Sequence, residues 1–220
     1  VRVSETDGSP SDTSNAAFTI TVVAPPSVNR LAVDFGAIGL FVWDNYIWSQ
    51  LTGANADGLT PADTDGDLVD EIVVDFGMFG AWLADGAAWT QLSGVNADGL
   101  IAADADGDGA DGIVGDFGSI GLWLWESGAW TQLSGVNADW AVAGQADGDA
   151  GEEIAGDFGA TGLWFWNDSV WSQISGLNAD AALAADLEGT ANQEFVVDFG
   201  TTGLWVNGPG GWQQISGLNA

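Results

Sequence analysis

Cysteine, histidine and lysine are absent from this 220-residue chain, and arginine occurs only at Arg2 and Arg30. The chain therefore has no disulfide, no thiol or imidazole for nucleophilic catalysis, and none of the usual zinc ligands except carboxylates. The 32 acidic residues give a formal net charge of −30, which opposes binding to nucleic acid and to anionic membrane surfaces. No uncharged apolar run is long enough to span a bilayer, so we expect no membrane insertion.

A unit of 41 residues repeats five times without a gap. Asp-Phe-Gly begins at Asp34 and returns at every step of 41, and the same step relates tryptophans and asparagines further along each unit. Residues 16–220 are whole repeats, and residues 1–15 stand outside them. Units of this length are supersecondary elements that bury their apolar faces against their neighbours. The repeat predicts one array rather than separate domains.

The third unit shows what each repeat contains. Its apolar and β-branched segments predict strands at 112–118, 121–125, 130–134 and 141–144, with a hairpin turn at 126–129. No sustained helical period is present, so helices are not expected. Four short strands per unit predict an all-β, five-bladed β-propeller of four-stranded blades, and a β-solenoid is the alternative.

Acidic loops precede the Asp-Phe-Gly strands at the four internal junctions. In the first, Asp63, Asp65 and Asp67 alternate around a glycine, and the Val69 carbonyl and Glu71 follow. In the second, Asp104, Asp106 and Asp108 alternate in the same way. Oxygen ligands in this pattern suit Ca²⁺ better than Mg²⁺, which demands a near-ideal octahedron. The alternative is a solvated acidic turn without metal.

The other two loops depart from this pattern. In the third, Gln145 replaces the first carboxylate while Asp147, Asp149 and Glu153 remain, so a metal site and an empty loop are both compatible with the sequence. The fourth loop, residues 186–194, keeps fewer carboxylates and is expected to be empty or weak. Residues 22–29 at the N-terminal equivalent offer no carboxylate.

Residues 62–77, Ala-Asp-Thr-Asp-Gly-Asp followed by Glu-Ile-Val-Val-Asp-Phe-Gly, resemble the FG-GAP/VCBS repeat. The resemblance covers residues 16–220 and implies a calcium-binding β-propeller of extracellular or cell-surface proteins. It supports Asp63, Asp65, Asp67 and Glu71 as ligands. In the second loop Gly112 stands where the last carboxylate belongs, and Asp111 is the candidate replacement. The family implies a scaffold or binding role, so we expect no enzyme.

Thirteen tryptophans fall mostly into two repeated columns. One interpretation is that they pack blade against blade, and the other is that they form a sugar-binding surface. Trp140, Trp43, Trp125 and Trp166 are the residues to examine for exposure. The Asp-Phe-Gly triplets lack every other element of a kinase site, because the chain has no lysine and no glycine-rich loop.

We therefore expect a processed or partial piece of a longer secreted protein, serving as a non-catalytic structural or adhesive module. Partners would be other copies, surface proteins or glycans, and a lectin is the alternative. Residues 17–24 are predicted to supply a missing strand to the last blade, closing a ring or joining the next subunit of a filament. Residues 1–15 would pair with a neighbouring subunit, or are the remnant of a preceding immunoglobulin-like domain.

Overall fold

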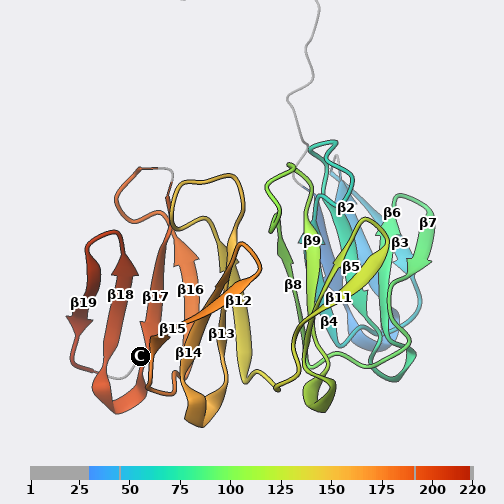
Figure 1. Cartoon of the computed structure of the whole chain (residues 1–220). Helices are drawn as coiled ribbons and strands as arrows, with labels where there is room; N and C mark the ends of the chain where they lie inside the picture. Colours follow the sequence, from blue (N-terminus) through green and yellow to red (C-terminus); the bar gives the residue numbers. More distant parts are fainter. Residues whose placement is uncertain (1–29, 45, 191, 219–220) are drawn as a thin grey trace, which may run out of the picture.

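The computed structural model describes residues 30–44, 46–190 and 192–218. Within these ranges nineteen strands form five antiparallel sheets, of which four have four strands and the first has three (Figure 1). The strands of the first two sheets are β1 (Leu31–Asp34), β2 (Leu40–Asp44), β3 (Ile47–Thr52), then β4 (Gly58–Ala62), β5 (Glu71–Asp75), β6 (Ala81–Asp85) and β7 (Ala88–Gln91).

The other three sheets repeat this order at the step of 41 residues. The third sheet contains β8 (Gly99–Ala103), β9 (Gly112–Asp116), β10 (Leu122–Glu126) and β11 (Ala129–Ser134). The fourth contains β12 (Trp140–Gly144), β13 (Glu153–Asp157), β14 (Leu163–Asn167) and β15 (Val170–Ser175). The fifth contains β16 (Ala181–Ala185), β17 (Glu194–Asp198), β18 (Leu204–Gly208) and β19 (Gly211–Ser216). The all-β prediction and the predicted strand positions are confirmed.

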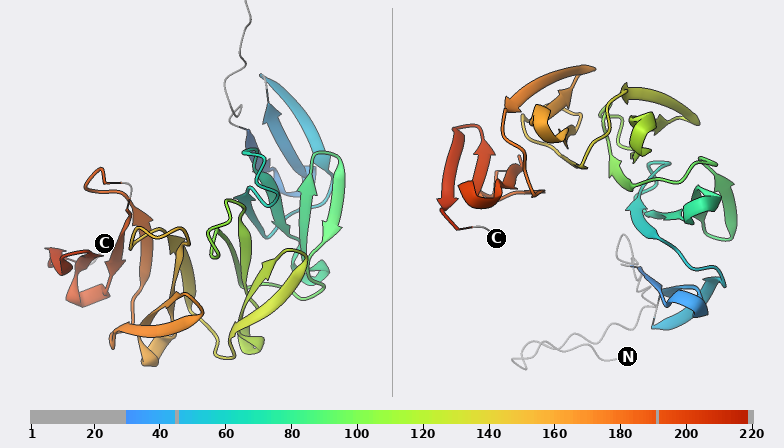
Figure 2. Two further views of the ribbon diagram at one scale, coloured as in Figure 1. Left: turned by 45° about the horizontal axis from the view of Figure 1, so that its top comes forward. Right: turned by 90° about the horizontal axis from the view of Figure 1, so that it is seen from below.

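The five sheets stand side by side along an arc, with the first and the last at opposite ends (Figure 2). The last four sheets contact one another through their first strands, because β4 contacts β8, β8 contacts β12, and β12 contacts β16. This arrangement is consistent with a β-propeller. The described residues form an open arc and do not show a closed ring.

The hydrophobic core lies between sheets rather than in one central volume. Ile113 of β9 packs with Ala62, Val73 and Leu92 of the second sheet, and Ile154 of β13 packs with Val114 and Leu122 of the third. Phe195 and Val197 of β17 fill the next gap, against Ala155 and Leu163 of the fourth sheet. Strands β9 and β13 are buried along their whole length because a neighbouring sheet covers each face.

The repeated Asp-Phe-Gly triplet forms a tight turn that the sequence analysis did not anticipate. Each aspartate accepts a hydrogen bond from the backbone N–H two residues later, as Asp116 Oδ1 does from Gly118 at 2.9 Å. Gly118 has a φ of +58°, a conformation that L-residues rarely adopt, and it begins a single 3₁₀ turn. The five turns are η1 (Gly36–Ile38), η2 (Gly77–Phe79), η3 (Gly118–Ile120), η4 (Gly159–Thr161) and η5 (Gly200–Thr202).

In the last three sheets the third-strand tryptophan joins its sheet to the one before it. The Nε1–H of Trp130 donates to the Leu92 carbonyl at 2.8 Å, and Trp171 and Trp212 make the same bond to Leu133 and Ile174. Each ring also packs edge-on against the phenylalanine of its own Asp-Phe-Gly turn, as Trp130 does with Phe117 at 5.2 Å between centroids. The packing interpretation is confirmed for these three tryptophans.

The prediction that the last blade lacks a strand is wrong. The fifth sheet already has four strands, because β16 pairs with β17. In the described sheets the segment before each acidic loop joins the sheet that follows it, as β4 joins β5, rather than the preceding one. Residues 1–15 and 17–24, with the roles predicted for them, lie outside the described residues.

The Trp130 bond can be tested by replacing Trp130 with phenylalanine. Trp130→Phe keeps most of the buried ring but removes the N–H donor, leaving the Leu92 carbonyl without its partner. We expect the free energy of unfolding to fall by about 1–2 kcal/mol in urea denaturation. Trp48→Phe is the matched control, because Trp48 belongs to the first sheet and its side chain is 47% exposed. Equal losses in both variants would contradict a role for the inter-sheet bond.

Candidate metal centre

Three acidic clusters of the described residues could hold a metal ion. They consist of Asp63, Asp65 and Glu71; of Asp104, Asp106 and Asp108; and of Asp147, Asp149 and Glu153. In each cluster one carboxylate oxygen per residue lies within 4.8 Å of the others. The structure therefore brings together nine of the twelve predicted ligands. The third loop, which the sequence left open, has a complete cluster.

The first residue of each loop holds the turn by accepting backbone hydrogen bonds. Asp63 accepts from Gly66, Asp67 and Leu68, at 2.8–3.1 Å. In the third loop Gln145 stabilises the turn in the same way, because its amide oxygen accepts from the backbone N–H groups of Asp147 and Gly148. Its amide nitrogen donates to the Asp149 and Gly151 carbonyls. The amide therefore preserves the loop conformation while removing one negative charge.

Two of the three clusters include a buried glutamate. Glu71 Oε2 accepts from the backbone and the hydroxyl of Thr64, and Glu153 Oε2 accepts from the backbone of Ala146. Glu153 is 3% exposed, and its other oxygen, Oε1, is enclosed without a hydrogen-bond partner among the described residues. Burial, and then the charges of Asp147 and Asp149, raise the pKa of Glu153 to about 7. Within residues 30–44, 46–190 and 192–218 the only arginine is Arg30, which pairs with Asp44, so Glu153 has no positive partner there.

The remaining three predicted ligands lie elsewhere. Asp67 is in the first loop but outside its cluster, and its Oδ1 accepts from the backbone N–H of Val69. The Val69 carbonyl stays a predicted ligand. Asp111 does not replace the last carboxylate of the second loop, because its Oδ2 accepts from the Asp63 backbone of the preceding loop at 2.8 Å. The prediction for Asp111 is therefore wrong, because this carboxylate joins two successive loops.

The Asp111 contact recurs between successive acidic loops. The Asp111 N–H also donates to the Asp63 carbonyl, so backbone and side chain together clamp one residue. Glu152 clamps Asp104 and Gln193 clamps Gln145 in the same two-bond arrangement. The repetition with Asp, Glu and Gln shows that the clamp needs an acceptor oxygen rather than a charge. It fixes the first residue of each clamped loop against the next sheet.

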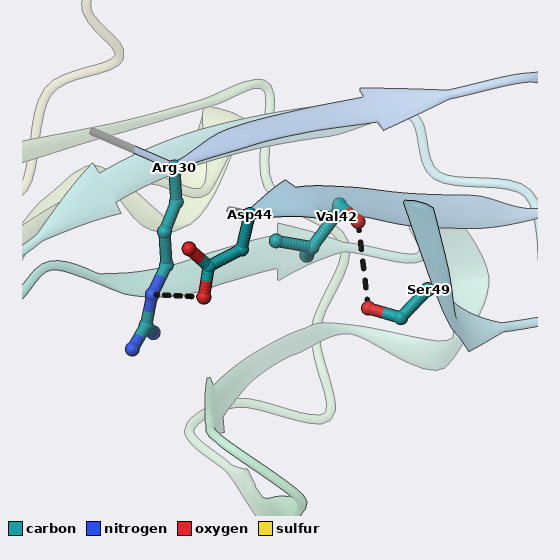
Figure 3. Close-up of polar contacts among 4 residues, drawn as sticks. All are labelled: Arg30, Val42, Asp44 and Ser49. Carbon is teal, nitrogen blue, oxygen red and sulfur yellow. Dashed lines mark hydrogen bonds and ion pairs between the residues drawn. The ribbon is translucent and has the colours of Figure 1, made fainter. Parts of the chain in front are cut away.

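The first sheet carries an ion pair at the start of its described residues. Arg30 Nε lies 3.9 Å from Asp44 Oδ2, at the end of β2, and Ser49 Oγ donates to the nearby Val42 carbonyl at 3.4 Å (Figure 3). The two charged side chains are 42% and 36% exposed. Such a pair contributes at most about 1 kcal/mol. It nevertheless places one of the chain's two positive charges beside a carboxylate.

A second row of carboxylates was missed by the sequence analysis. Asp98, Asp116 and Asp139 line a hollow that Trp140 also borders, between the third and fourth sheets. Burial, followed by the charges of Asp98 and Asp139, raises the pKa of Asp116 to about 6. The sequence does show these aspartates, because Asn-Ala-Asp recurs with the 41-residue step. It does not show that they line one hollow, since only the fold brings residues 98, 116 and 139 together.

Comparison with solved structures shows the fold. The chain is similar to the Agrocybe aegerita lectin in a structure on recognition of non-reducing terminal N-acetylglucosamine, with a TM-score of 0.58 and 20% identity. That match covers 84% of this chain and 65% of the lectin chain. BBS1N in complex with ARL6DN gives a TM-score of 0.59 at 13% identity, covering 92% of this chain and 69% of the other. A chain of the Mitotic Checkpoint Complex gives 0.56 at 12% identity, covering 87% and 61%.

These structures are β-propellers, so the five-sheet array has propeller architecture, and the chain spans about two thirds of their length. No family model and no curated protein matches the sequence. The resemblance to FG-GAP/VCBS repeats therefore stays a prediction. No helix among the described residues is long and apolar enough to cross a membrane.

The pKa of Asp116 gives a pH dependence with a definite sign. The folded pKa of about 6 lies above the ordinary 3.8, so the folded state keeps a proton that the unfolded chain releases. The associated stability is complete below pH ~4 and is lost as pH rises through 6. With metal chelated, the unfolding free energy of the wild type should fall between pH 4 and pH 7. In Asp116→Asn we expect this fall to be smaller by about 1–3 kcal/mol. Parallel pH curves for variant and wild type would contradict this.

Proposed function

We propose that this chain is a non-catalytic β-propeller module stabilised by calcium, with a structural or adhesive role in an extracellular or cell-surface protein. The observation that carries the proposal is the enclosed Oε1 of Glu153, which has no hydrogen-bond partner among the described residues and belongs to a carboxylate clustered with Asp147 and Asp149. Burying an unpaired charge is unfavourable by several kcal/mol, and a bound cation removes that cost.

The ligand chemistry favours calcium among common cations. The side-chain atoms that could bind the ion are all carboxylate oxygens of aspartate or glutamate. Two clusters contain two aspartates and a glutamate, and the other contains three aspartates. Ca²⁺ accepts six to eight oxygen ligands in variable geometry, whereas Mg²⁺ requires a regular octahedron. A net charge of −30 with no lysine adds a general attraction for divalent cations.

Two further features support a non-catalytic role. Histidine and cysteine are absent, and the acidic clusters repeat at equivalent places in successive sheets. An enzyme site is instead a single asymmetric arrangement of distinct groups. The resemblance to FG-GAP/VCBS repeats supports the extracellular assignment, together with the acidic, propeller-like array.

Calcium removal provides the direct test. Ligand that binds only the folded state at 100 times its Kd stabilises by ~2.7 kcal/mol, which for a chain of this size raises the melting temperature by about 5–10 °C. We expect excess EDTA to lower the melting temperature of calcium-loaded protein by that order, and magnesium to restore less than calcium. An unchanged melting curve, on protein shown to start loaded, would overturn the proposal.

A pair of matched variants localises the effect. Asp149→Asn removes one carboxylate from the third cluster, and its side-chain oxygen can still accept from the Gly151 N–H. Asp168→Asn removes the same charge from a hairpin turn, where a φ of +48° suits asparagine. The calcium-dependent shift should shrink in the first variant and persist in the second.

Carbohydrate binding is the second candidate, favoured by the hollow bordered by Trp140, Asp98 and Asp139. An aromatic face beside carboxylate acceptors is suited to a sugar ring and its hydroxyls. The similarity to a lectin supports the idea only through the shared fold, at 20% identity. Against it, the Trp140 N–H already donates to the Ala179 carbonyl at 3.0 Å, and Trp125 packs into the core between the second and third sheets.

Tryptophan fluorescence distinguishes the two candidates. If the hollow binds sugar, N-acetylglucosamine should change the fluorescence saturably, and Trp140→Ala should abolish that change while the protein keeps its circular dichroism spectrum. Glucose is the control for specificity. No change with either sugar would remove the carbohydrate candidate and leave the calcium proposal untouched.

A further inference from the structure

One pair of positions adjoins the acidic loop in the last four sheets and has an equivalent at Arg30 and Asp44 in the first. In the third sheet β9 and β10 pair from Leu122 with Asp116 to Trp125 with Ile113, so the next opposed residues are Gly112 and Glu126. We call this the corner pair, meaning the residue that follows the loop and the residue opposite it on the next strand. The five corner pairs are Arg30 and Asp44, Glu71 and Asp85, Gly112 and Glu126, Glu153 and Asn167, and Glu194 and Gly208.

Both members of the corner pair can reach the loop above them. Glu153 hydrogen-bonds to the backbone of Ala146, which belongs to the third loop. Its partner Asn167 donates from Nδ2 to Asp147 Oδ2 of the same loop at 2.9 Å. A side chain at either position therefore has access to the carboxylate cluster. The position on the second strand was not singled out by the sequence pattern.

In the third and fifth sheets the glutamate occupies opposite members of the pair. In the fifth sheet Glu194 follows the loop and Gly208 faces it, and a Cβ on Gly208 would lie 2.8 Å from Glu194 Cγ. In the third sheet the glycine follows the loop instead. A Cβ on Gly112 would lie 2.8 Å from Leu124 Cδ1 and 3.1 Å from the Trp125 carbonyl. The packing around Gly112 therefore excludes a glutamate there, and Glu126 stands opposite.

The surroundings of Glu126 are those of an unfilled ligand position. Its Oε1 is enclosed and has no hydrogen-bond partner among the described residues. Glu126 occupies the second-strand corner position that Asn167 occupies in the fourth sheet, where Asn167 donates to Asp147 of the third cluster at 2.9 Å. The residue equivalent to Asp147 in the second cluster is Asp106, and that cluster holds no glutamate of its own.

We propose that Glu126, from the neighbouring strand β10, supplies the fourth carboxylate of a divalent-cation site formed with Asp104, Asp106 and Asp108. The inference rests on the proposed calcium-stabilised function and assigns a ligand to one site. It replaces the earlier candidate, Asp111, which clamps the preceding loop. The enclosed Oε1 is the oxygen that would face the ion.

The first sheet supports the same assignment by its chemistry. There Arg30 and Asp44 form the corner pair, so a guanidinium stands beside the second-strand carboxylate (Figure 3). The corner pair in the third sheet has a carboxylate at the same second-strand position, but the residue opposite it is Gly112, which has no side chain to balance the charge. A bound divalent cation would supply there the positive charge that Arg30 supplies in the first sheet.

Calcium titration calorimetry on the chelated full chain tests the assignment. Glu126→Gln keeps the size of the side chain but removes its charge, and we expect one class of sites to bind calcium at least about tenfold more weakly. Glu152→Gln is the matched control. It removes one charge beside the same loop, from a clamp that Gln193 already forms with an amide. That variant should change the affinity by no more than about twofold.

Asp106→Asn separates failure of this inference from failure of the proposed function. If Asp106→Asn weakens a site while Glu126→Gln behaves like Glu152→Gln, Glu126 is not a ligand and the calcium proposal stands. If wild-type protein binds no calcium, both are overturned. Should Glu126→Gln not fold, Glu126→Asp replaces it, because the shorter side chain retracts the carboxylate by one methylene. Wild-type affinity in that variant would overturn the assignment.

Discussion

The burial of central strands between neighbouring sheets is the constraint on which this molecule depends. β9 and β13 are covered on both faces, and the three gaps between the second and fifth sheets are filled by residues such as Ile113, Ile154 and Phe195 from the later sheet. A sheet removed from the array would expose these side chains to water. The tryptophan and clamp bonds cross the same three gaps and join each of these sheets to the preceding one.

This constraint also decides where the carboxylates gather. The clamps hold the first residue of a loop against the following sheet, so the loops are stacked along the array rather than free to separate. Carboxylates held in this way repel one another and cannot relax apart, and buried members such as Glu153 lose water as well. Rigid stacking and cation binding are therefore two aspects of one arrangement, with the fold supplying the rigidity.

The corner pairs show how a repeat can vary without losing its geometry. Because the two positions are opposed in an antiparallel register, a carboxylate on either strand reaches the same space, as Glu153 and Asn167 both do. Glu194 uses one strand and Glu126 the other, each with glycine opposite. Arg30 shows that a side chain can also provide the positive charge. Comparing loops by their sequence position alone overlooks such exchanges.

The repeat, the strand positions and the first two acidic loops follow from the sequence alone, because period, β-branched runs and alternating aspartates are local signals. The sequence left the third loop open, and the structure brings its three carboxylates together. The sequence did not determine which sheet a strand joins. β4 follows the first sheet in the chain but pairs with β5 in the second. Assigning such strands to the preceding sheet led to the wrong prediction that the fifth sheet lacks a strand. The sequence analysis also misplaced Asp111 and overlooked Glu126 and Asp116. Asp111 bonds to the preceding loop, Asp116 lines a hollow with a carboxylate of the next repeat, and Glu126 stands on the strand opposite the one that follows its loop. These neighbours are distant in the sequence, so only the packing of sheet on sheet reveals them.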